Sequence, residues 1–242
     1  MKNGLLGRFT NLSEPNKKTI YLLLLLIVGD LFYITIHSIN VLSAHRNPLF
    51  HLGIDRGYPE FYNYLKYLWI ITLLILFSRK NKTVYMFPFI NLYFYFLIDD
   101  SFMFHENLGI YFRDNYNFQI PLLGRQEFGE LLPSVSAFSV FMILFFILSK
   151  YSAFRFKYIS VGMFILIFFL VFFGVVVDAL NDSNYSHVVN YFFTLAEDGG
   201  ELIVISLTCW WSFLLLFCDQ NDLKTISDNF KEFLIKIRLL KA

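Results

Sequence analysis

Six long apolar segments constrain the fold of this chain more than any other feature of its sequence. A helix that crosses a membrane needs about 20 mostly apolar residues, because the hydrocarbon core is about 30 Å thick and a helix rises about 1.5 Å per residue. The segments are Thr19–Leu42, Tyr62–Phe77, Val84–Phe104, Leu131–Ser149, Ile159–Leu180 and Val189–Phe217. They predict an all-α, polytopic integral membrane protein with six transmembrane helices in a bundle.

Composition excludes the main alternatives to a membrane protein. Of the 242 residues, 57% are apolar and only 16% are charged, whereas a soluble domain has about a quarter charged residues. A net charge of +1 does not indicate the excess of basic residues that nucleic-acid-binding proteins carry. We therefore expect membrane lipid around the chain and no nucleic-acid partner, and we exclude a soluble enzyme and a disordered protein.

The basic residues fall in alternate connections between the apolar segments. Most of the 20 Lys and Arg residues lie in the N-terminal tail, the second and fourth connections and the C-terminal tail. Because Lys and Arg concentrate in cytoplasmic loops, both termini are predicted to lie in the cytoplasm and three connections outside. We expect an integral protein of a bacterial plasma membrane in this orientation.

The second apolar segment leaves the number of spans open to an alternative. Tyr62–Phe77 is among the shortest of the six and carries Lys66 near one end. A charged residue at membrane depth is costly unless it is paired or reaches the interface. Six spans is our prediction, and five spans or a tilted second helix are the alternatives.

The chain is expected to form one transmembrane domain with two short tails. Residues 1–18 are the cytoplasmic N-terminal tail, residues 19–218 the transmembrane domain and residues 219–242 the juxtamembrane tail. In the last tail Ile226, Phe230 and Ile237 recur at helical spacing, with lysines between them. This pattern predicts a short amphipathic helix in the plane of the cytoplasmic headgroups. A plain juxtamembrane stub is the alternative.

Ionisable residues gather at the outer end of the third segment. The stretch from Asp99 to Glu106 also contains His105. Along a continuous helix Asp99 and Glu106 are seven positions apart and project on the same face, because seven residues make nearly two turns. His105 followed by Glu106 begins the zinc-protease motif, but the second histidine is missing, since position 109 is Gly109.

Two other segments carry acidic groups at a similar predicted depth. Glu197, Asp198 and Glu201 lie within five residues of the last segment, and three ionised carboxylates this close would repel one another unless something neutralised them. The first segment carries Asp30 and, seven residues later, His37. For Asp30 the structural alternative is a carboxylate that is protonated or bonded to a Tyr or Asn of a neighbouring span, and for His37 it is a place at the interface.

Carboxylates and imidazoles from several helices at one depth predict a metal centre, because helical bundles build metal sites in this way. Oxygen and imidazole ligands without thiolate suit Zn, Mn or Fe(II). The predicted ligands of this divalent ion are His37, Asp99, His105, Glu106, Glu197 and Glu201.

These residues lead to a hypothesis about function. We expect a metal-dependent membrane hydrolase or transferase that acts on a lipid or lipid-linked substrate from the outer side, with Asp198 as general base and Asp30 as a second catalytic candidate. One alternative is a proton- or cation-coupled transporter or channel subunit, because intramembrane acidic residues also mark such pathways. The other is a membrane subunit whose acidic cluster binds a protein partner. The sequence leaves a homo-oligomer open.

Overall fold

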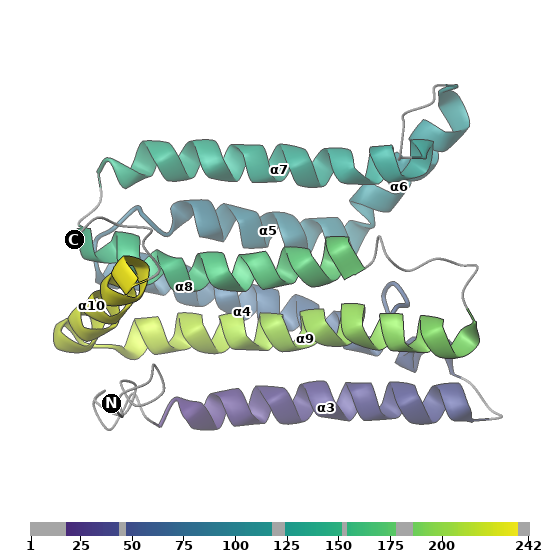
Figure 1. Cartoon of the computed structure of the whole chain (residues 1–242), viewed down its shortest axis with the longest axis horizontal. Helices are drawn as coiled ribbons and strands as arrows, with labels where there is room; N and C mark the ends of the chain where they lie inside the picture. Colours follow the sequence, from purple (N-terminus) through teal and green to yellow (C-terminus); the bar gives the residue numbers. More distant parts are fainter. Residues whose placement is uncertain (1–17, 44–46, 118–123, 152–153, 178–185, 237–242) are drawn as a thin grey trace.

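The computed structural model describes residues 18–43, 47–117, 124–151, 154–177 and 186–236. Every regular element within these ranges is a helix (Figure 1). The elements are α3 (Ile20–Leu42), η1 (Pro48–Phe50), α4 (Tyr58–Lys80), α5 (Phe87–Phe102), α6 (Phe104–Asn115), α7 (Arg125–Ser149), α8 (Phe154–Val171), η2 (Phe172–Val177), α9 (His187–Phe217) and α10 (Gln220–Lys236). The all-α prediction is confirmed.

Five helices are long and apolar enough to cross a membrane: α3, α4, α7, α8 continued by η2, and α9. This is the pattern of an integral membrane protein. The third predicted segment forms α5, which has 16 residues and is shorter than the roughly 20 residues that a full span needs. By length and composition the structure therefore supports five spans.

The second predicted segment is longer in the structure than in the sequence pattern. Its helix α4 has 23 residues, Tyr58–Lys80, and is one of the five candidate spans. Polar residues at its beginning continue the helix beyond the apolar run. The doubtful span is thus α5, and not the segment that carries Lys66.

The long helices run side by side, and short elements mark the two ends of the molecule (Figure 1). α6 extends from one end, on the right of Figure 1, where α3 finishes and α9 begins. α10 lies at the opposite end, where α9 finishes and α3 begins. We call these the α6 end and the α10 end. The arrangement brings segments that are far apart in the sequence together at each end.

The core lies between α4, α5, α8 and α9. Ile70, Phe89, Ile159 and Ile205, one from each of these helices, are all fully buried. Phe145 of α7 joins this core, and its ring centroid lies 4.7 Å from that of Phe164 in α8. Because apolar side chains on the outer faces of α3 and α7 stay exposed, these faces have the surface that lipid contact requires.

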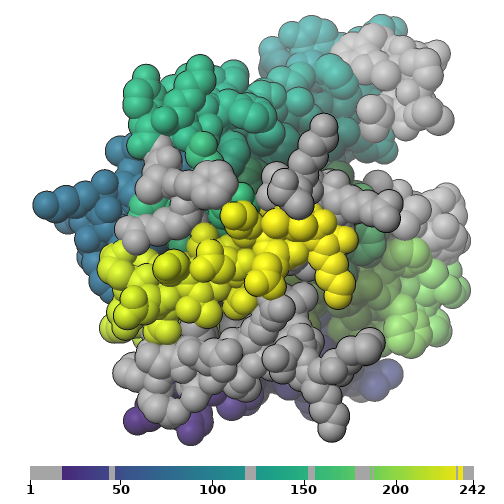
Figure 2. Space-filling model, turned by 60° about the vertical axis from the view of Figure 1, so that its left-hand side comes forward, coloured from purple at the N-terminus to yellow at the C-terminus, as the bar shows by residue number. Residues whose placement is uncertain are grey.

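The predicted C-terminal helix is present as α10, but α8 covers its apolar side. Leu223 and Ile226 are buried, and the ring of Phe230 packs edge-on against Trp211 of α9 at 5.8 Å. Figure 2 shows α10 in yellow, lying across this end of the molecule. Lys80 Nζ donates to the carbonyl oxygen of Leu216 at 2.6 Å and so caps the end of α9. The helix closes the α10 end instead of offering its apolar face to lipid.

Candidate functional site

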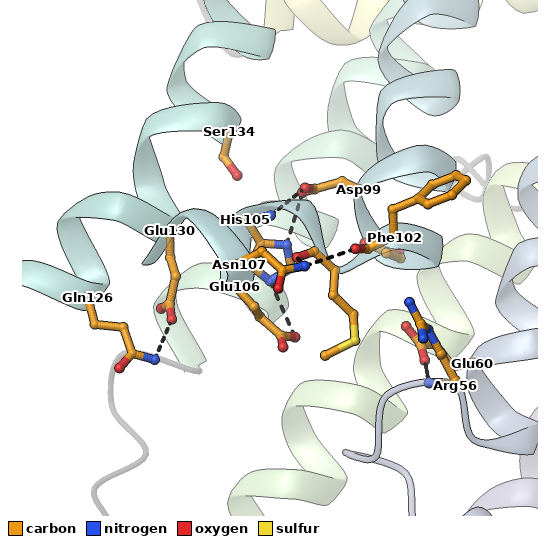
Figure 3. A network of polar contacts seen from close by, with 12 residues as sticks. Arg56, Glu60, Asp99, Phe102, His105, Glu106, Asn107, Gln126, Glu130 and Ser134 are labelled. Atoms are coloured by element: carbon orange, nitrogen blue, oxygen red, sulfur yellow. Dashed lines mark hydrogen bonds and ion pairs between the residues drawn. The ribbon is translucent and has the colours of Figure 1, made fainter. Parts of the chain in front are cut away.

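The turn between α5 and α6 brings Asp99 and His105 together. Met103, with φ 52° and ψ 44°, is left-handed, ends α5 and starts α6 in a new direction. The His105 backbone N–H then donates to Asp99 Oδ1 at 3.0 Å, and His105 Nδ1 lies 3.1 Å from Asp99 Oδ2 (Figure 3). The prediction that Asp99 and Glu106 share a face of one continuous helix is wrong, because the helix breaks between them.

A tyrosine of the same helix, supported by a serine of α7, fixes the Asp99 carboxylate. Tyr95 donates its hydroxyl hydrogen to Asp99 Oδ2 at 2.8 Å, and the Ser134 hydroxyl of α7 lies 3.3 Å from that Tyr95 oxygen. Asp99 is almost fully buried. The hydrogen bond from His105 to this carboxylate raises the pKa of His105 to about 9, although burial opposes the shift. The imidazole is therefore charged at neutral pH.

This pKa predicts a loss of stability in alkaline solution. The folded-state pKa of about 9 is above the ordinary value near 6.5, so the stabilisation is complete below about pH 6.5 and is lost as the pH rises through about 9. We expect the melting temperature to fall between pH 7 and pH 10, and to fall less in His105→Gln. Thermal unfolding in detergent measures both. Equal falls in the two proteins would contradict a charged His105.

Glu106 lies beside His105 and is influenced by two other carboxyl groups. Its Oε1 is 3.9 Å from His105 Nε2, and the nearby side chains of Asp55 and Glu130 act on its charge. Burial, followed by the charge of Asp55, raises the pKa of Glu106. Two carboxyls in contact share a proton or need a cation, because two adjacent negative charges repel.

The close crossing of α6 and α7 positions Glu130. A Cβ atom on Gly109 would lie 2.6 Å from the Glu130 Cγ, and one on Gly129 would lie 2.7 Å from the Gly109 Cα. The two glycines therefore let the helix backbones almost touch. Gln126 Nε2 donates to Glu130 Oε1 at 2.9 Å (Figure 3), which holds the carboxylate over α6.

His37 lies at the α6 end but faces a different partner, the loop before α4. His37 is fully buried, and its Nδ1 accepts the backbone N–H of Leu52 at 3.1 Å. Its ring stacks on Tyr191 of α9 at 5.7 Å and meets the ring of His51 edge-on at 4.4 Å. His51 is half-buried, and no local sequence pattern points to this contact.

The acidic residues of α9 face two other elements. Asp198 Oδ2 lies 2.9 Å from the place that a Cβ of Gly53 would take, so Asp198 packs against the loop before α4. The Glu201 carboxylate lies against Gly174 in η2. Glu197 is half-buried. All three acidic side chains have interaction partners.

Asp30 forms a buried ion pair that the sequence analysis missed. Lys66 Nζ lies 3.0 Å from Asp30 Oδ1, and both side chains are 0% exposed. The same ammonium donates to the carbonyl oxygen of Leu202 at 2.9 Å and lies near the Ser206 hydroxyl at 3.3 Å. A lysine and an aspartate that both lie inside apolar segments are the signal that could have predicted the pair.

The six predicted metal ligands lie in three places. His37 contacts the loop, Asp99, His105 and Glu106 lie near the α5–α6 turn, and Glu197 and Glu201 lie along α9. Within the described residues no group of three or more His, Cys, Asp or Glu side chains is arranged to hold a metal ion. The Leu52 N–H also occupies the Nδ1 lone pair of His37. The ring proton is then on Nε2, so neither nitrogen offers a lone pair to a metal ion.

A family comparison places the region from α3 to α9 in one family. The model of the Domain of unknown function DUF8692 matches residues 19–217. The chain belongs to this family. The matched range runs from the residue before α3 to the end of α9, so it contains the Asp99–His105 turn, the loop before α4 and the Asp30–Lys66 pair, and it leaves out α10. Comparison with curated proteins and with solved structures gives no match.

Proposed function

We propose that this DUF8692 protein is a membrane enzyme, a hydrolase or transferase that acts on a lipid or lipid-linked substrate at the α6 end. The observation that carries the proposal is the Asp99–His105 pair beside Glu106. A charged imidazole held by a buried carboxylate is a proton donor of fixed orientation, and Glu106 is a proton acceptor next to it. General acid–base catalysis needs both groups near one substrate.

In the proposed reaction His105 donates a proton and Glu106 accepts one. Asp99 holds Nδ1 of His105, so Nε2–H is the proton that faces away from the pair. For an ester, Glu106 takes a proton from the attacking water, the ester C–O bond breaks, and Nε2–H protonates the leaving oxygen. Asp198, our earlier choice of base, packs on the nearby loop and is a second acceptor at this end. Asp30 is fully buried in its ion pair with Lys66, so we give it no catalytic step.

We also propose that a divalent cation, Zn, Mn or Fe(II), assists the reaction. The contact between Glu106 and Asp55, with Glu130 nearby, supports it, because a cation would stabilise the ionised carboxylates. These residues differ from the predicted ligand set, of which only Glu106 is retained. When bound, such an ion would polarise the substrate carbonyl.

The proposed orientation follows from charge. Arg79, Lys80 and Lys150 lie at the α10 end, as do the lysines of α10, and basic residues favour the cytoplasmic side. We propose that α5 crosses the membrane with the five longer helices, that both termini are cytoplasmic and that the α6 end faces outward from a bacterial plasma membrane. A substrate in the outer leaflet would then reach His105.

The test is lipid hydrolysis by the purified protein in nanodiscs, with a panel of fluorescent phospholipid esters as probes. We expect His105→Gln to reduce the rate by roughly 100-fold, the usual size of a general-acid contribution. Asp114→Asn is the matched control, because it removes an exposed carboxylate from the same helix and should leave the rate unchanged. Metal analysis of the same preparations should find a divalent ion that Glu106→Gln loses.

Two outcomes would overturn these proposals. Wild-type rates on every ester for His105→Gln would remove the basis for the enzyme. Absence of metal from the active wild-type protein would remove the cation and leave acid–base chemistry alone. If no ester is hydrolysed, pH-dependent cation flux in liposomes tests the transporter alternative.

A further inference from the structure

The loop of residues 47–57 contacts candidate site residues from three helices. Leu52 N–H bonds to His37 of α3 at 3.1 Å, Gly53 lies against Asp198 of α9, and Asp55 lies near Glu106 of α6. Both ends of the loop are fixed as well. Asn47 and Asn40 exchange two hydrogen bonds, of 2.8 and 2.9 Å, and the Arg56 N–H donates to the Glu60 carboxylate (Figure 3). The loop therefore lies over the α6 end as an ordered cover.

The bond between Leu52 and His37 lies in the middle of this cover and requires a neutral imidazole. An Nδ1 atom accepts a hydrogen bond only through its lone pair, and protonation of the ring would replace that lone pair with a second donor. His37 and Leu52 are both buried, so no water at the surface takes the place of either partner. Loss of the bond would leave the Leu52 N–H facing an imidazolium.

We propose that residues 47–57 form a lid over the site, and that protonation of His37 releases it. The inference rests on the proposed function only in naming what the lid covers. In the closed form the Leu52 N–H is bonded to His37 and Asp55 lies beside Glu106, whose side chain is 29% exposed. In the released form the loop no longer restricts the approach of a substrate to His105 and Glu106.

The groups around His37 decide the direction of this pH response. His51 of the loop and Tyr191 of α9 touch its ring, and a charged His37 would repel a charged His51. Asp198 of α9 lies against the next loop residue, and Asp30 on α3 is neutralised by Lys66 of α4. Protonation of His37 removes the acceptor of the Leu52 N–H, so His37 is the group whose charge opposes the closed loop.

Hydrogen exchange of the full chain in nanodiscs, followed by mass spectrometry with residue resolution at Leu52, tests the lid. Protection is corrected for the intrinsic pH dependence of exchange. In the wild type we expect the protection of the Leu52 amide to fall by roughly tenfold between pH 7.5 and pH 5, the size expected for one lost hydrogen bond.

Two variants at position 37 separate titration from folding. His37→Asn keeps an acceptor atom at the position of Nδ1 and cannot be protonated in this range, so its Leu52 protection should stay high at both pH values. His37→Phe removes the acceptor, and its Leu52 protection should be low at both. A wild type whose corrected protection does not change with pH, or an asparagine variant that responds as the wild type does, would overturn the proposal.

This experiment measures the lid without any substrate. If exchange behaves as expected and His105→Gln keeps full ester hydrolysis, the lid stands and the acid–base function fails. If His105→Gln is inactive while Leu52 exchange is independent of pH, the enzyme stands and the lid fails.

Discussion

Replacing Lys66 by methionine should lower the free energy of unfolding by about 3–5 kcal/mol, because the change leaves the Asp30 carboxylate buried without a countercharge. Both side chains are 0% exposed, so water cannot solvate the remaining ion. The lysine also joins three helices, since it contacts Asp30 of α3 and the Leu202 carbonyl and Ser206 hydroxyl of α9. Loss of the lysine therefore removes contacts between helices as well as the countercharge of Asp30.

The double variant Asp30→Leu/Lys66→Met gives the decisive comparison. Removal of both charges avoids an unpaired buried ion, and such replacements are often neutral. We expect the double variant to recover most of the stability that Lys66→Met loses. Equilibrium unfolding in mixed detergent micelles measures the wild type, the two single variants and the double variant, and Lys224→Met at an exposed position of α10 is the control for loss of a lysine. A double variant as unstable as the sum of the single changes would show that the pair does not act as a unit.

The pair also shows how far the sequence could predict the fold. Apolar length located the helices, because a membrane span depends on one simple quantity. The partner of Asp30 was within reach of the same reasoning, since Lys66 is a cation inside an apolar segment and needs an anion at its depth. In the sequence pattern Lys66 weakens the second span, and only the structure shows it as the partner of Asp30.

The hydrophobic pattern of the sequence could not predict that the helix ends at Met103. Helix ends of this kind usually have glycine in the left-handed position, and here the residue is methionine. Neither glycine nor proline occurs between Asp99 and His105, so helical periodicity extended through the turn. The tertiary contacts of Asp99 with Tyr95 and His105 stabilise a conformation that the local sequence disfavours.

The contacts of the loop before α4 could not be predicted from the sequence either. Asp55 and His51 lie in a short polar connection, where solvated side chains are the usual expectation. Their contacts with Glu106 and His37 depend on where the end of α3 and the beginnings of α6 and α9 lie relative to one another. The sequence therefore identified most of the acidic and imidazole residues of the α6 end, and it missed the loop that joins them.

Gly129→Ala should destabilise the protein by about 3 kcal/mol, the upper part of the usual range for overpacking. The added Cβ would lie 2.7 Å from the Gly109 Cα and 2.9 Å from the Leu108 carbonyl oxygen. These are backbone atoms, so α7 has to move away from α6. Because Glu130 follows Gly129, the movement would also draw its carboxylate away from Glu106.

Gly199→Ala is the matched control for this change. It adds the same methyl group to a buried helical glycine, but the nearest atom there is the Ile34 Cδ1 at 3.5 Å, an ordinary contact. Alanine favours a helix over glycine by about 0.5–1 kcal/mol, so this variant should be as stable as the wild type or slightly more stable. The free energies of unfolding of the two variants, measured in mixed micelles, should therefore differ by more than the change in helix propensity alone. Equal stabilities would mean that α6 and α7 do not cross at Gly109 and Gly129, and Glu130 would then lose its place beside the proposed acid–base pair.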